Sequence, residues 1–296
     1  EIKAKSALHY HERETPCHFD LNVYRGCTHR CQYCFARYSH TYLGSQSFFQ
    51  DIYVKTNIVE LLGRELNSRR WKGEAIRLGG VSDCYQPIEQ EMVLMPPLLE
   101  RFIEHENPLY LSTKSSLIER DLELYARLAK KAQVHVSVSL TTMDEKLQRI
   151  LEPGASSSLE RLKALASLRE VGCSTTVLLM PVLPYITDDR DSLEELFAAS
   201  KQFGAQALKA GALKLRGGTK SAYFRFLSQY IPGLRAEYRR LYAGRSKVRT
   251  SYRKDLYDLI QCLSEKYGLA QVSLDDGIVR ARTAFSAGQQ LRLPFD

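Results

Sequence analysis

Short apolar segments and amphipathic segments alternate along the first two thirds of the chain. Six segments rich in β-branched and apolar residues indicate strands, and between them apolar residues recur every three or four positions, as in helices packed on one face. Parallel strands joined by such helices predict an α/β fold. The strands are expected at 19–24, 75–78, 109–113, 134–140, 174–180 and 207–215, and the helices at 55–68, 95–105, 119–131, 159–171 and 192–203.

The pattern changes after Gly217 to helices alone, which are expected at 221–230, 234–242 and 251–267. We therefore predict a boundary after residue 216. One domain occupies 1–216, and a basic helical extension with a C-terminal tail occupies 217–296. The most apolar run is short and interrupted by prolines, so no membrane span and no membrane partner are predicted.

The net charge of +8 arises entirely in the extension. Residues 1–215 contain 27 Lys and Arg against 27 Asp and Glu, whereas 216–254 contain eleven basic residues and one acid, Glu237. Aromatic residues lie between the basic ones, a composition that suits phosphate contacts and base stacking. The alternative is amphipathic helices whose basic faces are only solvated. The predicted contacts to nucleic acid are Arg239, Arg240, Arg245 and Lys247.

Three cysteines, Cys27, Cys31 and Cys34, lie within eight residues after the first expected strand. Three thiolates on a short loop can hold three irons of a 4Fe–4S cluster and leave the fourth iron open for chemistry. A zinc site with His29 or His40 as the fourth ligand is the alternative. The seven cysteines form no disulfide framework and nothing marks the chain as secreted, so we expect a cytoplasmic protein.

Small or polar residues follow several strands at their carboxyl ends, where the active sites of parallel barrels gather. Gly79 and Gly80 allow the backbone to approach a ligand closely. The Ser82-Asp83 pair can bond an amino group, Lys114 can meet a carboxylate, and the hydroxyl of Ser139 suits a ribose. Together these strand ends predict one binding site for a zwitterion.

The spacing of the three cysteines, with Tyr33 before the last of them, resembles the radical S-adenosylmethionine signature. The stretch 21–37, together with the residues around 82, 114 and 139, resembles the spore photoproduct lyase-related family of DNA repair photolyases, over residues 5–216. The resemblance implies a partial (β/α)6 barrel and a 4Fe–4S cluster. It also implies reductive cleavage of S-adenosylmethionine to a 5′-deoxyadenosyl radical, with a flavodoxin- or ferredoxin-type electron donor.

The resemblance also assigns roles to single residues. Ser82, Lys114 and Ser139 match positions that contact S-adenosylmethionine in the lyase, and Tyr33 is expected against the adenine. The glycines 79–80 and Asp83 would lie nearby. The resemblance thus implies an enzyme that acts on nucleic acid, in lesion repair or modification, while a peptide or a small metabolite is the alternative substrate.

Two positions depart from the lyase pattern. Gly80 stands where the lyase has a cysteine that returns a hydrogen atom, and Phe35 stands where it has a tyrosine of its radical relay. The residues that generate the radical are therefore kept, and those that quench it are not. We thus expect a relative of the lyase rather than the lyase itself. Cys84 and Tyr85 are the candidates for relaying or quenching a radical.

The end of the chain carries a further motif. It resembles the hexapeptide by which bacterial repair proteins and polymerases dock on the sliding clamp, with alternating apolar residues that would fill a groove. The alternative is a final edge strand packed on the barrel. The residues expected to contact the clamp are Gln290, Leu291, Leu293 and Phe295.

Overall fold

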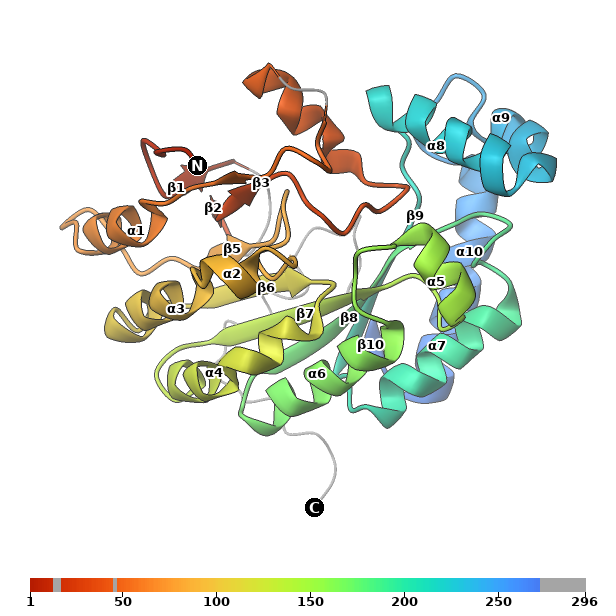
Figure 1. The fold of residues 1–296 in the computed structure, drawn as a ribbon. Coiled ribbons are helices and arrows are strands. Elements are labelled where there is room, and N and C mark those ends of the chain that lie inside the picture. The colour runs from red at the N-terminus through yellow and green to blue at the C-terminus, as the bar shows by residue number, and fades with distance from the viewer. Residues whose placement is uncertain (13–16, 45–46, 272–296) are drawn as a thin grey trace.

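An eight-stranded sheet runs through the molecule (Figure 1), which we describe from a computed structural model for residues 1–12, 17–44 and 47–271. The strand order is β1-β2-β5-β6-β7-β8-β9-β10. All neighbouring strands are parallel except the first pair. The strands are β1 (Leu8–Tyr10), β2 (Phe19–Leu21), β5 (Ile76–Leu78), β6 (Leu109–Thr113), β7 (Val134–Leu140), β8 (Ser174–Val182), β9 (Ala207–Ala212) and β10 (Ala270–Gln271).

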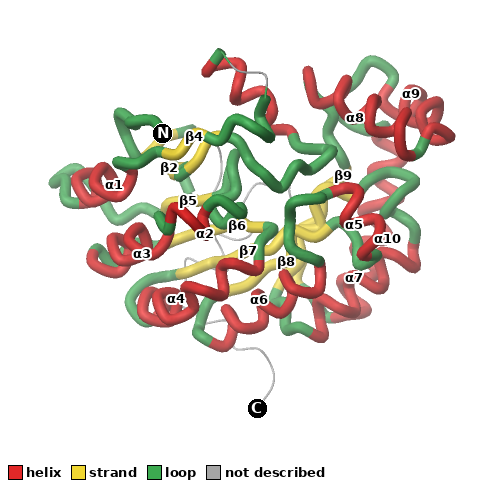
Figure 2. Tube along the Cα trace, viewed as in Figure 1, coloured by secondary structure: helices red, strands yellow, loops and turns green. Residues whose placement is uncertain are grey.

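Helices cover the outer side of this sheet, and Figure 2 shows the strands at the centre with the helices outside them. This arrangement confirms the predicted α/β partial barrel, with a helix between successive strands from β2 to β9. Two short helices, α2 (Glu89–Met92) and α5 (Glu145–Leu151), were not predicted. The predicted helices correspond to α1 (Ile58–Leu66), α3 (Met95–Glu104), α4 (Leu122–Ala129), α6 (Ser158–Glu170) and α7 (Arg190–Gln202).

Two of the predicted strands are shorter in the structure. The strand expected at 19–24 leaves the sheet after Leu21, because Asn22 turns the chain and its side chain accepts a hydrogen bond from Val81 N. The next residues form β3 (Tyr24–Arg25), which pairs with β4 (Tyr53–Val54). The strand expected at 207–215 ends at Ala212, since Leu215 N bonds to Ser246 O in the extension instead.

The two faces of the sheet differ in chemistry because alternate residues of a strand point to opposite sides. In β6, Leu109 and Leu111 are buried in the core shared with the helices, whereas Tyr110 and Ser112 are half-buried on the other face. The same alternation places Arg77 between the buried residues of β5. On β5 and β6 the inner face of the sheet therefore carries polar side chains.

The last helices, α8 (Gly217–Tyr230), α9 (Arg235–Tyr242) and α10 (Thr250–Tyr267), pack on the β8 and β9 side of the barrel. One continuous hydrophobic cluster contains Val177 and Leu208 from the strands and Tyr223 and Ile260 from these helices. The boundary expected after residue 216 stays a prediction. The residues on its two sides share this core.

Buried tyrosine hydroxyls fasten the extension to the loops after the strands. Tyr238 donates to Pro184 O at 2.7 Å, and Tyr242 donates to Leu213 O at 2.7 Å. These bonds satisfy carbonyl groups that have left the sheet, so each hydroxyl replaces a strand partner.

None of the described helices is both long and apolar enough to cross a membrane. The residues expected to contact the sliding clamp lie outside the described part of the chain: Gln290, Leu291, Leu293 and Phe295.

We expect Tyr238→Phe to lower the free energy of unfolding by about 1–2 kcal/mol, because the buried Pro184 carbonyl loses its donor. Urea denaturation of the purified protein measures the change. Tyr230→Phe is the matched control, since Tyr230 is 50% exposed and the substitution should cost about 0.5 kcal/mol or less. Equal costs for the two variants would contradict the anchoring role of the Tyr238 hydroxyl.

Candidate active site

The three cysteines lie on the loop between β3 and the 3-10 helix η1 (Phe35–Leu43), and all three are free thiols. Burial raises the pKa of Cys31 well above its usual value, and the neighbouring thiols of Cys34 and Cys27 raise it further. The three sulfur atoms are therefore close enough to influence one another. Burial also raises the pKa of Cys27 to about 12.

Backbone amides surround the sulfur atoms and favour the thiolate form. The amides of Asp83 and His29 lower the pKa of Cys27, and those of Ala36 and Arg37 lower the pKa of Cys34, in each case against the larger effect of burial. Hydrogen bonds from the protein to sulfur are one of the means by which proteins tune iron–sulfur clusters. Three neighbouring thiols with amide donors thus fit such a cluster.

Gly26 forms the turn that leads into the cysteine loop. Gly26 has a φ of +87°, and a Cβ there would lie 2.7 Å from Asp51 O, so no side chain fits at this position. The next residue is held by a bond from Cys27 N to Phe48 O at 3.2 Å. The turn at Gly26 and this bond therefore fix the backbone that leads into the cysteine loop.

Side chains of the loop after β5 support the turn at Gly26 by hydrogen bonds. Ser82 Oγ donates to Gly26 O at 2.7 Å, and Gln86 Nε2 donates to the same oxygen at 3.1 Å. Gln86 Oε1 accepts from Thr28 N at 2.9 Å. The side chains of Ser82 and Gln86 therefore hold the backbone on both sides of Cys27.

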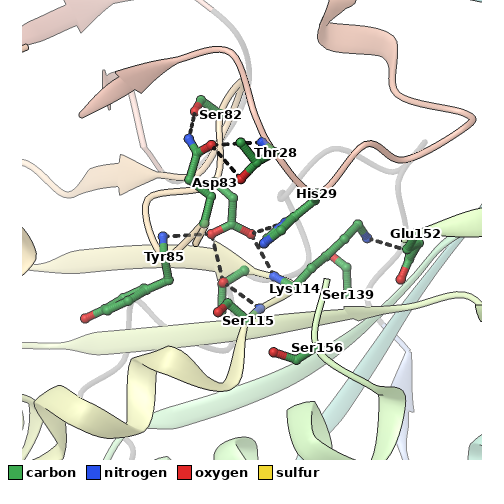
Figure 3. A network of polar contacts seen from close by, with 12 residues as sticks. Thr28, His29, Ser82, Asp83, Tyr85, Lys114, Ser115, Ser139, Glu152 and Ser156 are labelled. Carbon is green, nitrogen blue, oxygen red and sulfur yellow. Dashed lines mark hydrogen bonds and ion pairs between the residues drawn. The ribbon is translucent and has the colours of Figure 1, made fainter. Parts of the chain in front are cut away.

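Asp83 joins the end of β6 to the cysteine loop, as Figure 3 shows. Its carboxylate accepts hydrogen bonds from Thr113 Oγ1 at 2.8 Å, from Lys114 N at 2.8 Å and from Tyr85 N at 2.9 Å. It also lies 3.5 Å from His29 Nδ1. Burial lowers the pKa of His29, and the carboxylate of Asp83 opposes that effect.

A second carboxylate, Glu152, lies at the other side of the loop and is fully buried. It pairs with Arg161 Nη2 at 2.5 Å and with Lys114 Nζ at 3.3 Å, and it accepts a hydrogen bond from the Tyr33 hydroxyl. Burial alone raises the pKa of Glu152, but the two cations outweigh it and lower that pKa to about 2. Glu152 is therefore ionised and links the cysteine loop to β6.

Arg161 is the largest fully buried side chain among the described residues, and each part of its guanidinium has a partner. Besides the ion pair of Nη2 with Glu152, the guanidinium donates from Nε to Ser156 O at 2.8 Å and from Nη1 to Ser139 O at 2.7 Å. The guanidinium thus connects α6 to the end of β7 and to the segment after α5.

The segment 151–156 lies directly against the cysteine loop. Gln32 N donates to Leu151 O at 2.9 Å, and Gly154 N donates to His29 O at 3.0 Å. A Cβ at Gly154 would lie 2.1 Å from Thr28 O, so only glycine permits this contact. The loop is thereby enclosed by backbone on the side opposite Ser82.

The structure brings most of the predicted site residues to one place. Tyr33, Ser82, Asp83, Lys114 and Ser139 all lie around the cysteine loop and the ends of β5, β6 and β7. The side chains of Ser82 and Asp83 hold the loop itself, and Lys114 is paired with Glu152.

Three predicted residues have other surroundings. The Tyr85 hydroxyl points away from the loop, donates to Asp121 Oδ2 at 2.8 Å and lies 3.1 Å from the Tyr125 hydroxyl. Cys84 is buried in the same core as Tyr85. Gly79 has a φ of +84° and its Cβ would lie 2.1 Å from Ser112 O, so the packing of β5 on β6 already requires a glycine there. Gly80 has no such contact.

The two histidines of the zinc alternative have partners other than the thiols. His29 Nδ1 faces Asp83, and His40 Nε2 lies 2.7 Å from Asp51 O. Within residues 1–12, 17–44 and 47–271, no group of three or more His, Cys, Asp or Glu side chains is arranged to hold a single metal ion.

Sequence reasoning missed four residues of this network, namely Gln86, Glu152, Gly154 and Arg161. The Pro153-Gly154 pair signals a turn, but its contact with the cysteine loop is a tertiary feature. Arg161 lies on the face of α6 that also buries Leu162 and Leu165, and this position in the apolar pattern is the available sign of its burial.

Comparison with known proteins gives a family match and several relatives. The model of the Radical SAM superfamily matches residues 21–197. An uncharacterized protein of Mycobacterium tuberculosis (strain ATCC 25618 / H37Rv) is 35% identical over 275 residues, which cover 91% of this chain and 81% of the relative. An uncharacterized protein of Methanocaldococcus jannaschii is 28% identical over 183 residues, covering 62% of this chain and 66% of the relative.

Solved structures support the same fold. A spore photoproduct lyase complexed with dinucleoside spore photoproduct matches with a TM-score of 0.67 and 18% identity, covering 91% of this chain and 79% of that one. Streptococcus suis SuiB bound to precursor peptide SuiA matches with a TM-score of 0.55 and 15% identity, covering 88% and 49%. The predicted likeness to spore photoproduct lyase is thus confirmed at the level of the fold.

We expect Arg161→Met to destabilise the protein by about 3–5 kcal/mol, because it leaves the buried Glu152 carboxylate without its main partner. Chemical denaturation gives the change in the free energy of unfolding. Arg149→Met is the control, since the exposed Arg149–Glu145 pair should contribute about 1 kcal/mol or less.

The double variant Arg161→Met with Glu152→Gln should recover part of that loss, since it removes both charges. A cost for Arg161→Met no larger than that for Arg149→Met would show that the buried pair does not hold the site together.

Proposed function

This chain belongs to the radical SAM superfamily of enzymes, and from that premise we propose that Cys27, Cys31 and Cys34 hold a 4Fe–4S cluster at which S-adenosylmethionine is cleaved. The observation that carries the proposal is one loop that presents three free thiols, framed by amide donors, at the carboxyl ends of the parallel strands. When bound, the cluster and S-adenosylmethionine supply one-electron reductive cleavage and abstraction of a hydrogen atom. A flavodoxin- or ferredoxin-type protein is the proposed electron donor.

We assign the binding of S-adenosylmethionine to the ends of β5, β6 and β7. Lys114 is the cation for the carboxylate of the ligand, because its ammonium is fixed by Glu152 beside the cysteine loop and keeps part of its surface exposed. Ser139 supplies a hydroxyl at the same edge, and a Cβ at Gly80 would meet Asp20 and Arg77 only at ordinary contact distance. Ser82 and Asp83 act here by fixing the loop and the Lys114 backbone.

Nucleic acid is the proposed substrate class, and the position of the extension supports it. Thr219 at the start of α8 donates from Oγ1 to Cys34 O at 3.2 Å, so the basic helices begin at the cysteine loop. Arg239, Arg245 and Lys247 are exposed, while Arg240 is exposed and paired with Glu237. The solved lyase complex with a dinucleoside lesion supports the same class.

Aromatic side chains near the loop suit unpaired bases. Phe35, directly after Cys34, is 58% exposed, and Tyr38 on the same 3-10 helix is 50% exposed. Exposed rings beside cationic side chains are the usual means of binding unstacked bases. The proposed action is therefore repair or modification of a base made accessible in nucleic acid, by an enzyme distinct from spore photoproduct lyase.

Protein reconstituted without oxygen should bind about four irons and four sulfides per chain and, with dithionite, release 5′-deoxyadenosine from S-adenosylmethionine. Cys31→Ala should abolish both, because one of three protein ligands is lost. Cys262→Ala is the control, since Cys262 lies exposed on α10 and should leave both unchanged. A protein that binds one zinc and cleaves nothing would refute the proposal.

Binding to an oligonucleotide should weaken steeply as salt increases, because phosphate contacts release counterions. Replacing four basic residues of the extension by Ser should reduce the slope of log K against log salt by up to about 3.6, at about 0.7–0.9 for each phosphate contact. The four residues are Arg239, Arg240, Arg245 and Lys247.

The control for this experiment replaces four exposed basic residues on the barrel helices, which should leave the slope unchanged. Binding without any salt dependence, or no binding at low salt, would favour a peptide or small-metabolite substrate instead. The control residues are Lys130, Lys146, Arg149 and Lys163.

A further inference from the structure

The loop after β8 carries a tyrosine in an unusual backbone conformation. Tyr185 has a φ of +61°, in the left-handed region that bulky side chains rarely adopt. It is 48% exposed, and it is the one exposed residue of 183–188. Backbone strain of this kind persists only where the surrounding structure imposes it, and it gathers at binding and active sites. The fold therefore holds an aromatic ring at the surface against the preference of its own backbone.

Hydrogen bonds fix the loop on both sides of Tyr185. Leu183 O accepts from Thr187 N at 2.9 Å, and Leu183 N donates to Thr187 Oγ1 at 2.9 Å. Directly before the tyrosine, Pro184 O accepts from the Tyr238 hydroxyl at 2.7 Å. These bonds close the turn, so the left-handed conformation is set by the packed structure around it.

Two tyrosines of the extension lie beside the exposed ring. The centroid of Tyr185 is 6.4 Å from that of Tyr238 on α9 and 6.2 Å from that of Tyr252 on α10. Aromatic rings attract one another at such distances, and both pairs have the inclined geometry that their quadrupoles favour. Tyr252 is itself fixed, because its hydroxyl donates to Asp188 Oδ2 at 2.5 Å. Rings from two helices thus support Tyr185, and nearly half of its surface stays exposed.

The loop lies at the carboxyl ends of the strands, beside the basic helices. β8 continues past Leu179, the partner of the last residue of β7, so the loop lies beyond the end of β7. On α9, the exposed Arg239 follows Tyr238 directly. The exposed Arg249 comes directly before α10, three residues before Tyr252. A ring beside helices with exposed guanidinium groups suits a base together with its flanking phosphates.

Helix α8 connects this loop to the cysteine loop. At its start, Thr219 Oγ1 donates to Cys34 O at 3.2 Å, and one turn later the Tyr223 hydroxyl lies 3.2 Å from the Tyr238 hydroxyl. Tyr238 in turn holds the turn that carries Tyr185. The exposed ring and the cysteine loop are therefore fixed to the same helices.

We propose that Tyr185 stacks on a base of an unpaired nucleic-acid strand, a base that neighbours the one acted on at the cysteine loop. A tyrosine ring binds the π-face of any base, so this contact adds affinity with little sequence preference. The phosphates on either side face the basic residues of α9 and α10. This inference deepens the function proposed above and rests on nucleic acid being the substrate class.

The test compares two probes by fluorescence anisotropy at low salt, a single-stranded thymidine octanucleotide and an octamer of abasic sites with the same phosphates. Tyr185→Ala should weaken binding of the thymidine octanucleotide about 5- to 100-fold, the range for one base–aromatic stack. Binding of the abasic octamer, and the slope of log K against log salt, should stay unchanged, because no phosphate contact is lost. Tyr185→Trp should bind the thymidine octanucleotide at least as tightly as the wild type.

The matched control is Tyr10→Ala, since Tyr10 is 56% exposed on β1 at the edge of the sheet, and it should bind both probes as the wild type does. Tyr185→Asn is a second variant, because asparagine tolerates the left-handed conformation, and it should give the same result as Tyr185→Ala. It keeps the test valid if the alanine variant does not fold.

Two results would overturn the proposal. Equal weakening for the thymidine and abasic probes would mean that Tyr185 only packs the loop, and unchanged binding of both probes would mean that the ring meets no base. Failure of the wild type to bind either probe would instead refute nucleic acid as the substrate class. The two kinds of failure are therefore distinguishable.

Discussion

The geometry of the site depends on the need to pair a buried negative charge. Glu152 is fully buried, and an ionised carboxylate is tolerated there only because Arg161, Lys114 and the Tyr33 hydroxyl surround it. Each partner comes from a different part of the chain. The same contacts that satisfy the charge therefore fix the end of β6, the helix α6 and the cysteine loop relative to one another.

Hydrogen bonds and close packing between uncharged groups also hold the cysteine loop in place. Ser82 and Gln86 bond to the backbone before and after Cys27, and Gly154 allows the segment after α5 to pack on the other side of the loop. On the outside, tyrosine hydroxyls tie the basic helices to the strand ends. The proposed substrate surface and the cysteine loop are thus parts of one packed unit, linked by Thr219 and Cys34.

Local patterns determine what could be predicted from the sequence. The strands from β5 to β8 and the helices between them follow hydrophobic periodicity, and the cysteine spacing marks its own loop. The partners of the loop could not be predicted in this way. Ser82, expected beside a ligand, supports Gly26, and Tyr85 turns toward Asp121, because loop side chains are placed by tertiary contacts. Arg161 shows the same difficulty, since a single arginine on a helix normally lies in water.

The turn at Gly26 bears on how the proposed cluster could be rebuilt after exposure to oxygen. In many small metal sites the ligands come together only when the metal binds. Here the peptides around Cys27 are held by Ser82, Gln86 and Phe48, none of which is a ligand. If the proposed cluster is lost to oxygen, these contacts keep the cysteine loop in place. We therefore expect a new cluster to assemble on the loop without refolding of the barrel.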